Sequence, residues 1–323
     1  MSKKIITVVG ATGAQGGSVI TALLNSPVYS IRAITRSPQS DAARALVEKG
    51  VEVVQADLNN IGSLRSAFDG SHAIFAVTNF FDSFLTIGIQ KSMDNETQQG
   101  INLANAAAAT DSLEHYVWST LPNTRQNSGG RAVVPYFESK NRVDSHIRSL
   151  PDLLQKTTFV WIGWYASNIL MPTQHPTRIH TIDGSNRSYV QFISVPPSTL
   201  VPLLGDEKIN PGLFVKAILE QPQKTLPGKI VSGVDETRPF NEVLAWFAAV
   251  HGIEARSVQI LSADYVKMWP VLGETADLTN QYLSLMDGKG FSSVEEEVLT
   301  KEDLDVKGLV GTAEALKSVP LLG

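Results

Sequence analysis

A tyrosine and a lysine four residues apart, Tyr136 and Lys140, are the pair of side chains best suited to chemistry in this sequence. On a helix this spacing places both side chains on one face. A tyrosine hydroxyl can donate a proton to a carbonyl oxygen, and a neighbouring ammonium lowers the pKa of that hydroxyl. Ser119 and Thr120 could polarise the same carbonyl by hydrogen bonding. These four are the candidate catalytic residues, although Tyr-x-x-x-Lys is a short pattern that equally suits a partly buried aromatic at a helix start.

Three glycines near the N-terminus, Gly10, Gly13 and Gly16, follow a β-like run at the spacing G-x-x-G-x-x-G. Gly10 can leave the strand in a conformation that other residues resist, Gly13 lets the main chain approach a pyrophosphate, and Gly16 allows close helix packing. A helix beginning near Gln15 would direct free N–H groups at phosphates. The motif favours nucleotide binding over a glycine-rich turn without a ligand.

Arg36 ends the second β-like run, about 20 residues beyond the glycines. Domains that prefer NAD place an acidic residue there to accept from the ribose hydroxyls. An arginine can instead pair with a 2′-phosphate or stack on adenine. The sequence therefore predicts NADP(H) as cofactor, and the alternative is a solvated arginine at a strand end.

The elements that must position these residues alternate between strands and helices in the first half of the chain, which is typical of βαβ units. We expect strands at Lys4–Val9, Ser30–Thr35, Val51–Gln55, Ala73–Thr78, His115–Ser119 and Thr158–Gly163. We expect helices at Gly16–Asn25, Gln39–Glu48, Ile61–Phe68, Glu96–Thr110 and Phe137–Leu150. The pattern predicts an α/β fold, a Rossmann-type doubly wound parallel sheet, in residues 1–165.

The rest of the chain, residues 166–323, loses this alternation and is rich in proline. Helices are expected at Leu213–Glu220, at Phe240–His251 and at Asp264–Met286, with an interruption at Pro270 and Gly273. They predict a smaller, mainly helical substrate or partner lobe, some segments of which return to the sheet. Residues 125–131 suggest a mobile loop. Such a lobe would cover the carboxyl ends of the strands, where open α/β sheets bind ligands.

Side chains at those strand ends complete the expected site. Asp57 and Leu58 follow the third strand and would frame adenine, whereas Thr78, Asn79 and Phe80 end the fourth strand near the nicotinamide ribose. Aromatic residues gather at the ends of the fourth and sixth strands: Phe80, Phe81, Phe84, Trp161, Trp164 and Tyr165. They indicate either core packing or a pocket for a hydrophobic, aromatic small molecule.

Several motifs together resemble the NmrA-like branch of the short-chain dehydrogenase/reductase superfamily, over most of the chain. They are G-A-T-G-A-Q-G-G from Gly10, T-R from Thr35, V-T-N-F-F-D from Val77, F-E-S-K ending at Lys140 and Y-A-S-N from Tyr165. The resemblance implies an NADP(H) site that includes Gly10, Thr12, Gly13, Ala14, Gln15, Arg36, Asp57, Leu58, Thr78, Asn79, Phe80, Lys140, Tyr165 and Asn168. Regulatory members often carry another residue at the position of Tyr136, so this tyrosine points toward catalysis.

Composition and charge argue against nucleic-acid binding, a metal site and a membrane span. The formal net charge of −5 gives no reason to expect direct binding of nucleic acid. The chain has no cysteine, and His175 and His180 lack a third ligand at metal spacing, so no metal site is expected. No run approaches the length of about 18 apolar residues that a membrane span needs. We therefore expect a cytoplasmic protein that does not enter membranes.

Three functions fit these observations. The favoured one is an NADPH-dependent reductase of a carbonyl, imine or quinone, with Tyr136 as proton donor. The second is a non-catalytic regulator that senses NADP(H) and binds a protein partner. The third is a cyclase or isomerase that keeps NADP(H) as a scaffold. A homodimer is common in the wider superfamily, and the sequence shows no pattern that argues for one here.

Overall fold

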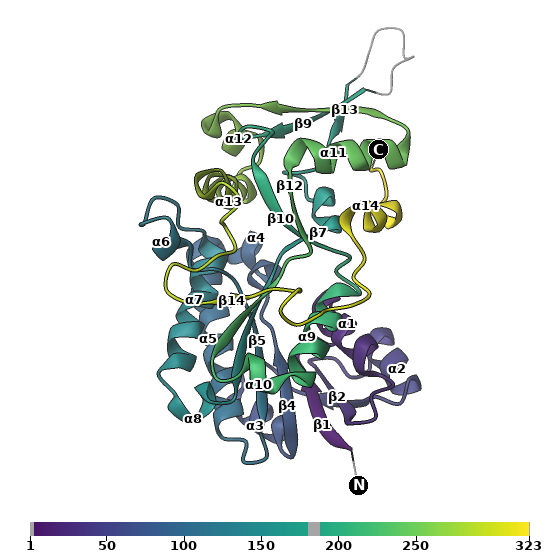
Figure 1. Ribbon diagram of the computed structural model, residues 1–323, viewed down its shortest axis with the longest axis vertical. Coiled ribbons are helices and arrows are strands. Elements are labelled where there is room, and N and C mark those ends of the chain that lie inside the picture. The colour runs from purple at the N-terminus through teal and green to yellow at the C-terminus, as the bar shows by residue number, and fades with distance from the viewer. Residues whose placement is uncertain (1–2, 180–187, 323) are drawn as a thin grey trace.

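Eight parallel strands form the central sheet of the computed structural model, which describes residues 3–179 and 188–322 (Figure 1). In spatial order they are β14 (Val298–Leu299), β11 (Lys229–Gly233), β6 (Thr157–Ile162), β5 (His115–Thr120), β4 (Ser71–Ala76), β1 (Lys4–Val8), β2 (Tyr29–Thr35) and β3 (Glu52–Gln55). All seven pairings are parallel. The order reverses between β1 and β4, the switch point at which such sheets bind ligands. The predicted Rossmann-type sheet is confirmed.

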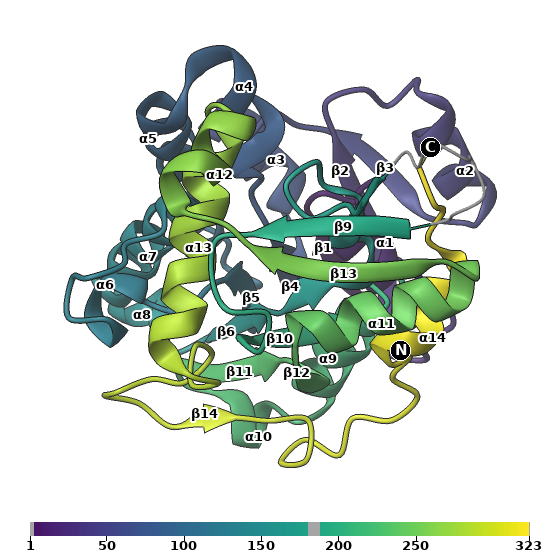
Figure 2. The ribbon, with the colours of Figure 1, turned by 90° about the horizontal axis from the view of Figure 1, so that it is seen from above.

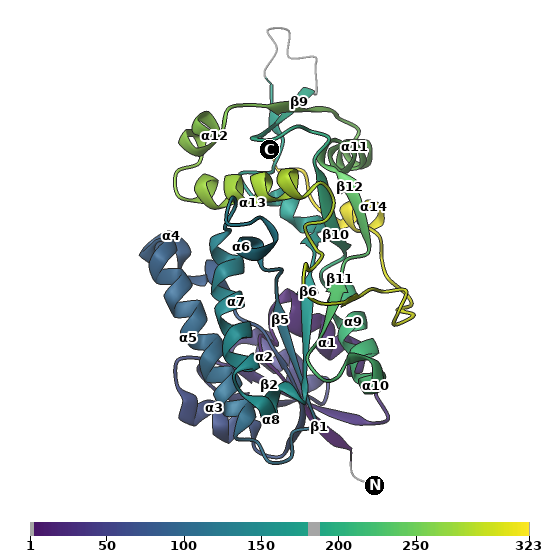
Figure 3. The ribbon, with the colours of Figure 1, turned by 60° about the vertical axis from the view of Figure 1, so that its left-hand side comes forward.

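Helices cover both faces of this sheet, as Figure 3 shows. One face packs against α1 (Ala14–Leu23), α2 (Asp41–Glu48) and α9 (Asn210–Glu220), and the other against α3 (Ile61–Phe68), α5 (Ile89–Ala108), α7 (Pro135–Arg148) and α8 (Pro151–Leu154). Short helices connect the elements: η1 (Phe80–Asp82), α4 (Phe84–Ile87), α6 (Thr124–Asn127) and α10 (Pro222–Thr225). Each face buries its own apolar cluster, which is why the strands read as continuous hydrophobic runs.

A second lobe lies above the carboxyl ends of the strands (Figure 1). It has two three-stranded sheets, one of β12 (Glu236–Pro239), β10 (Leu200–Gly205) and β7 (Trp164–Tyr165), the other of β13 (Glu254–Gln259), β9 (Ser188–Ile193) and β8 (Thr177–Arg178). Its helices are η2 (Ala166–Leu170), α11 (Phe240–His251), α12 (Ser262–Met268), α13 (Leu272–Met286), α14 (Thr312–Ala315) and η3 (Leu316–Ser318). Seen from above, β9 and β13 run side by side over the molecule (Figure 2). These elements share a third apolar cluster.

Several details differ from the sequence-based expectations. The upper lobe contains two three-stranded sheets beside its helices, so it is more mixed than the expected, mainly helical lobe. Its shortest strands, β7 and β8, give too few residues for a period to be read. The helix expected to start at Glu96 begins at Ile89, after Gly88. The expected loop at residues 125–131 opens with α6, which Asn123 caps by accepting from the N–H of Gln126. The interruption expected within Asp264–Met286 is confirmed at Pro270, which lies between α12 and α13, whereas Gly273 lies inside α13.

Beyond residue 165, strands β11 and β14 join the central sheet, and α9 packs on one of its faces. The return to the sheet is thus seen directly, whereas the division of the chain at residue 165 stays a prediction. No helix within residues 3–179 and 188–322 has the length and apolar character to cross a bilayer.

The first turn of the chain depends on two glycines. Gly10 has a φ of +65°, a left-handed conformation that side chains disfavour. A Cβ atom on Gly16 would lie 2.3 Å from the carbonyl oxygen of Gly10. Since that oxygen belongs to the backbone, it cannot move aside without displacing the turn. The close approach of α1 to the end of β1 therefore requires glycine at position 16.

We expect Gly16→Ala to lower the free energy of unfolding by about 1–3 kcal/mol, because the methyl group overpacks the turn. Gly17→Ala is the matched control, since a Cβ atom there would lie 3.6 Å from its nearest neighbour, the carbonyl oxygen of Ala11. In a helix that change should stabilise by up to about 1 kcal/mol. Urea unfolding of both variants measures the difference. Equal stability of the two would contradict the packing argument.

Candidate active site

The turn after β1 leaves backbone amides free at the start of α1. Gly13 donates its N–H to the carbonyl oxygen of Gly10 at 2.9 Å and is the N-cap of the helix. Among the described residues, no side chain caps this end, and the first turn of α1 has no acidic residue. Free N–H groups at a helix N-terminus bind phosphate groups. The turn thus fits a dinucleotide, and it contains the predicted residues Gly10, Thr12, Gly13, Ala14, Gln15 and Gly16.

Arg36 and Asp57 lie at the carboxyl ends of neighbouring strands, β2 and β3. The side chain of Arg36 is 68% exposed, and its Nη2 lies 3.1 Å from Oδ2 of Asp82 in η1. Leu58 packs against the apolar cluster on the α3 and α5 face. An exposed guanidinium at this edge of the sheet can bind a 2′-phosphate in place of the carboxylate of Asp82.

A buried ion pair joins the chain after β4 to α5 and α7. Nζ of Lys140 lies 3.1 Å from Oε1 of Glu96, and the two side chains are 10% and 1% exposed. Lys140 also donates to the carbonyl oxygen and to Oγ1 of Thr78, at 3.1 and 3.0 Å. The hydroxyls of Thr78 and Ser139 donate to the two carboxylate oxygens of Glu96. The lysine is therefore fixed at the carboxyl end of the central strand.

Glu96 is a residue of this site that sequence reasoning missed. It was read only as the first residue of a helix, whereas it lies in the second turn of α5, on the face that packs against α7. The available signal was a glutamate on the apolar face of a helix, where charged residues are rarely buried without a partner.

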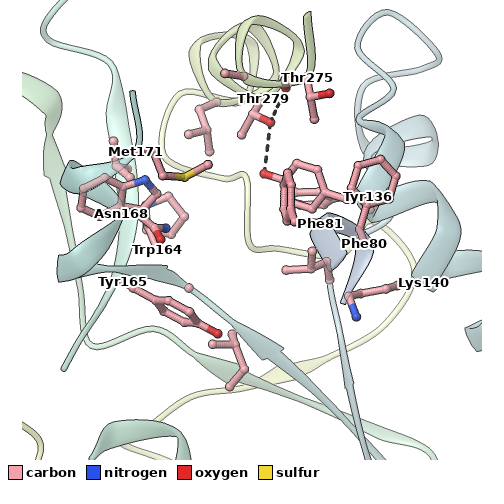
Figure 4. A pocket seen from close by; sticks show the side chains of 18 of the residues that line it. Phe80, Phe81, Tyr136, Lys140, Trp164, Tyr165, Asn168, Met171, Thr275 and Thr279 are labelled. Carbon is pink, nitrogen blue, oxygen red and sulfur yellow. Dashed lines mark hydrogen bonds between the residues drawn. The ribbon is translucent and has the colours of Figure 1, made fainter. Parts of the chain in front are cut away.

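Tyr136 lies one helical turn before Lys140, but its hydroxyl points toward α13 (Figure 4). The hydroxyl oxygen is 3.1 Å from Oγ1 of Thr279, and the ring packs against Phe81 at a centroid distance of 5.3 Å. Burial raises the pKa of Tyr136 to about 12, and the hydrogen bond with Thr279 offsets part of this rise. Lys140 does not lower this pKa as expected, because its ammonium is held by the buried ion pair. The hydroxyl therefore stays protonated at neutral pH.

Gln15, at the start of α1, forms hydrogen bonds with Ser119 and with Tyr165. The hydroxyl of Ser119 donates to Oε1 of Gln15 at 2.7 Å, and Nε2 of Gln15 donates to the hydroxyl oxygen of Tyr165 at 2.7 Å. Burial raises the pKa of Tyr165 to about 12, so this hydroxyl also keeps its proton. Thr120 is differently placed, since its hydroxyl donates to Oδ2 of Asp144 at 2.9 Å.

These side chains surround a cavity of about 320 Å³ between the sheet and the upper lobe. Phe80 and Phe81 form one wall, Trp164 and Met171 lie opposite, and α13 closes the top (Figure 4). Of the predicted residues, the cavity is lined by Gln15, Thr78, Asn79, Phe80, Ser119, Thr120, Tyr136, Lys140, Tyr165 and Asn168. The others, Gly10, Thr12, Gly13, Ala14, Gly16, Arg36, Asp57 and Leu58, lie outside its lining, after strands β1, β2 and β3. The lining from α13, including Thr275 and Thr279, carries no motif that sequence reasoning could have used.

His175, one of the two histidines considered as metal ligands, does not belong to the lining of this cavity. His175 contacts the carbonyl oxygens of Ile169 and Leu322, and His180 lies outside the described residues. Within the described part of the chain, no group of three or more histidine or carboxylate side chains could hold a metal ion.

Comparison with known proteins decides the family. The model of the NmrA-like family matches residues 2–303. The chain belongs to the NmrA-like family. Within that family, the NmrA-like family domain-containing oxidoreductase FrzB of Cladobotryum sp is 33% identical over 269 residues, which cover 80% of this chain and 76% of the relative. The predicted family is thereby confirmed.

Solved structures agree on the fold. NmrA, a negative transcriptional regulator, matches at 23% identity with a TM-score of 0.75, over 98% of this chain and 96% of its own. Other structures of NmrA contain NADP or NAD. The quinone oxidoreductase QOR2 from Escherichia coli, complexed with NADPH, matches at 17% identity with a TM-score of 0.68, over 96% of this chain and 98% of its own. These likenesses show that the chain has the fold of NmrA and of QOR2.

The buried ion pair makes a measurable contribution to folding. Glu96→Gln removes the charge that faces Lys140, and we expect the free energy of unfolding to fall by about 3–5 kcal/mol because the ammonium is left buried and unpaired. Asp94→Asn on the same helix is the control. Its carboxylate is 60% exposed and 3.4 Å from Arg142, so its loss should cost about 1 kcal/mol or less. Denaturant unfolding that shows equal small losses in both variants would refute this role for Glu96.

Proposed function

We propose that this protein is an NADPH-dependent reductase of a hydrophobic, aromatic small molecule that carries a carbonyl, imine or quinone group. The observation that carries the proposal is the cavity itself. It joins Gln15 of the phosphate turn to an aromatic wall and to protonated tyrosine hydroxyls. The oxidoreductase names of family relatives, and the NADPH-bound quinone oxidoreductase with the same fold, support this choice.

The cofactor would lie along the carboxyl ends of β1, β2 and β4. The free amides of α1 would bind its pyrophosphate, Arg36 its 2′-phosphate, and Lys140 with Thr78 the ribose on the nicotinamide side. When bound, NADPH supplies a hydride. Asp57 and Leu58 would frame the adenine. Asn79 caps η1 by accepting from the N–H of Phe81 and so keeps the aromatic wall beside the cavity.

The chain itself has two tasks in the chemistry, to polarise the acceptor and to deliver a proton. Ser119 is the polarising hydroxyl in this proposal. Its hydroxyl donates to Gln15, which also lines the cavity, and would donate to the acceptor instead when substrate binds, whereas the hydroxyl of Thr120 is turned to Asp144. Tyr136 is the proposed proton donor, because burial keeps it protonated and it lies within the aromatic wall. The apolar walls exclude water and bind the substrate by its rings.

Cofactor selection tests the role of Arg36. In calorimetric titrations we expect Arg36→Ala to weaken NADPH binding by about 10–100-fold, the value of a charge-assisted hydrogen bond, and to leave NADH binding unchanged. Arg44→Ala is the control, because Arg44 is an exposed arginine on α2 that pairs with Asp41 of the same helix. An unchanged ratio of NADPH to NADH affinity in Arg36→Ala would show that another residue reads the phosphate.

Turnover tests the role of Tyr136. With a panel of quinones, aldehydes and imines, we expect oxidation of NADPH, and Tyr136→Phe should lower kcat by about 10²–10⁴-fold with unchanged NADPH affinity. Tyr29→Phe, at the start of β2, controls for the loss of a hydroxyl elsewhere. Tyr165→Phe separates the two tyrosines, because a large loss there with full activity in Tyr136→Phe would assign the proton to Tyr165.

Two outcomes would favour the other functions. Tight binding of NADPH and NADP⁺ without turnover of any compound would favour a regulator that senses the cofactor. Conversion of a substrate without net oxidation of the cofactor would favour a cyclase or isomerase. In either case the reductase proposal would fail, whereas the cofactor prediction would stand.

A further inference from the structure

Two hydroxyl hydrogen bonds at the top of the cavity form a chain whose direction is fixed. The hydroxyl of Thr279 donates to the carbonyl oxygen of Thr275 in the same helix, at 2.9 Å. The same Oγ1 lies 3.1 Å from the hydroxyl oxygen of Tyr136. A hydroxyl has one proton and a carbonyl oxygen can only accept, so both bonds form together when Tyr136 is the donor in the second. The chain therefore runs from Tyr136 through Thr279 to Thr275.

The proton of Tyr136 is thus engaged by Thr279 (Figure 4). Tyr136 can give this proton to a substrate only after its O–H bond has turned away from Thr279. The ring packs against Phe81 and Phe137, at centroid distances of 5.3 and 4.9 Å, so the phenol oxygen stays beside Oγ1 of Thr279 while the proton turns. Once it has turned, the same oxygen is an acceptor for the hydroxyl of Thr279.

Thr279 can change its hydrogen bond without leaving its present acceptor unpaired. That acceptor, the carbonyl oxygen of Thr275, lies inside α13, where a carbonyl oxygen also accepts from the backbone N–H four residues later. Rotation about one C–O bond turns the hydroxyl of Thr279 from this carbonyl to Tyr136. Thr279 and Tyr136 both line the cavity and are both partly exposed. Their hydroxyls therefore form one unit that can change direction in the cavity wall.

A hydrogen bond from Thr279 stabilises Tyr136 more after proton transfer than before it. When Tyr136 donates, its O–H bond breaks, the proton goes to the acceptor, and the electron pair stays on Tyr136 as a phenolate. Hydrogen bonds to an ionised group are roughly twice as strong as those between neutral groups. The ammonium of Lys140 is paired with Glu96, so it is not free to neutralise the phenolate. A donor that favours the charged form of Tyr136 therefore lowers the barrier to proton transfer.

The charged side chains of α7 near Tyr136 and of the elements packed around it, η1, α5 and α13, have partners of their own or are exposed. They are Asp82 with Arg36, Asp94 with Arg142, Glu96 with Lys140, Glu138 with Arg125, Asp277 with the amide of Gln281, and the exposed Lys91 and Glu274. Burial raises the pKa of Tyr136 to about 12, and the hydrogen bond with Thr279 lowers it. A change in this pKa when Thr279 is substituted therefore reports their hydrogen bond.

We propose that Thr279 is a positioning residue for proton transfer from Tyr136. It accepts a hydrogen bond from Tyr136 before the reaction and donates one to the phenolate oxygen as the proton leaves. No proton leaves Thr279: the acceptor takes the proton of Tyr136 together with the hydride that NADPH supplies, and the phenolate regains a proton from water. The inference rests on the proposed function, in which Tyr136 is the proton donor.

Turnover of Thr279→Val tests this role, with NADPH and an acceptor that the unmodified protein reduces. Valine keeps the shape of threonine and removes the hydroxyl. We expect kcat to fall by about tenfold with KM and NADPH affinity unchanged, because the lost hydrogen bond forms to an ionised group. Thr279→Ser keeps a hydroxyl and should restore most of the rate. In the Tyr136→Phe background, Thr279→Val should cause no further loss.

Thr110→Val is the matched control. Thr110 is buried, its hydroxyl donates to the carbonyl oxygen of Ala106 at 3.0 Å, and it does not line the cavity. Its kcat should equal that of the unmodified protein. An unchanged kcat in Thr279→Val, or the same loss with tyrosine and with phenylalanine at position 136, would overturn the inference and leave the reductase proposal standing.

A second readout needs no turnover. A difluorinated tyrosine at position 136 is more acidic than tyrosine, and fluorine NMR follows its titration. Thr279→Val should raise the pKa of this residue, so that its dissociation constant falls by about tenfold, and Thr110→Val should leave it unchanged. An unchanged pKa in Thr279→Val would overturn the role of Thr279 even in an active reductase. A raised pKa in a protein that oxidises no NADPH would instead contradict the proposed function and leave the stabilisation of the charged tyrosine by Thr279 in place.

Discussion

The ion pair between Lys140 and Glu96 is the interaction on which the geometry of the site depends. Moving two charges out of water costs several kcal/mol for each ion, and a pair of this kind persists only when the remaining polar atoms are also satisfied. Here Thr78 and Ser139 supply those hydrogen bonds, so the pair ties the chain after β4 to α5 and to α7. A displacement of any one of the three elements would leave a buried charge without its partner.

The ion pair fixes the position of α7, and α7 directs Lys140 and Tyr136 to different sides of the cavity. Lys140 turns toward β4, whereas Tyr136, one turn earlier, turns toward Thr279 on α13 (Figure 4). The lysine therefore belongs to the cofactor side of the cavity and the tyrosine to its roof. In the expected arrangement the ammonium acidifies the hydroxyl, but here burial governs the tyrosine and keeps it protonated. A raised pKa makes the Tyr136 hydroxyl a weaker acid, so proton donation by it depends on the negative charge that would develop on the acceptor oxygen as the hydride arrives.

The residues proposed for the cofactor were easier to find in the sequence than those that line the cavity from the upper lobe. The glycine turn, Arg36 and Lys140 were recognisable because each occupies a fixed place in a βαβ unit, where strand, turn and helix follow one another directly along the chain. Glu96 was missed because its partner is 44 residues away in sequence and only the packing of α5 on α7 brings them together. The part of the cavity lined by α13 was missed for the same reason, since Thr279, which forms a hydrogen bond with Tyr136, is 143 residues away in sequence. The short strands of the upper lobe, such as β7 and β8 with two residues each, are set by tertiary pairing rather than by a local pattern.

The two ends of the proposed cofactor site differ in how firmly their side chains are held. At the end proposed for the nicotinamide, the side chains of Lys140 and Glu96 are buried, whereas at the end proposed for the adenosine the side chains of Arg36 and Asp82 are 68% and 53% exposed. An exposed pair contributes at most about 1 kcal/mol, so a phosphate dianion can displace Asp82 from Arg36 at little cost. Asp82 lies in the same short helix as Phe80 and Phe81, which form the aromatic wall of the cavity. The segment after β4 therefore contacts both Arg36, the residue proposed to bind the 2′-phosphate, and the aromatic wall proposed to hold the substrate, and its exposed end at Asp82 can change partners.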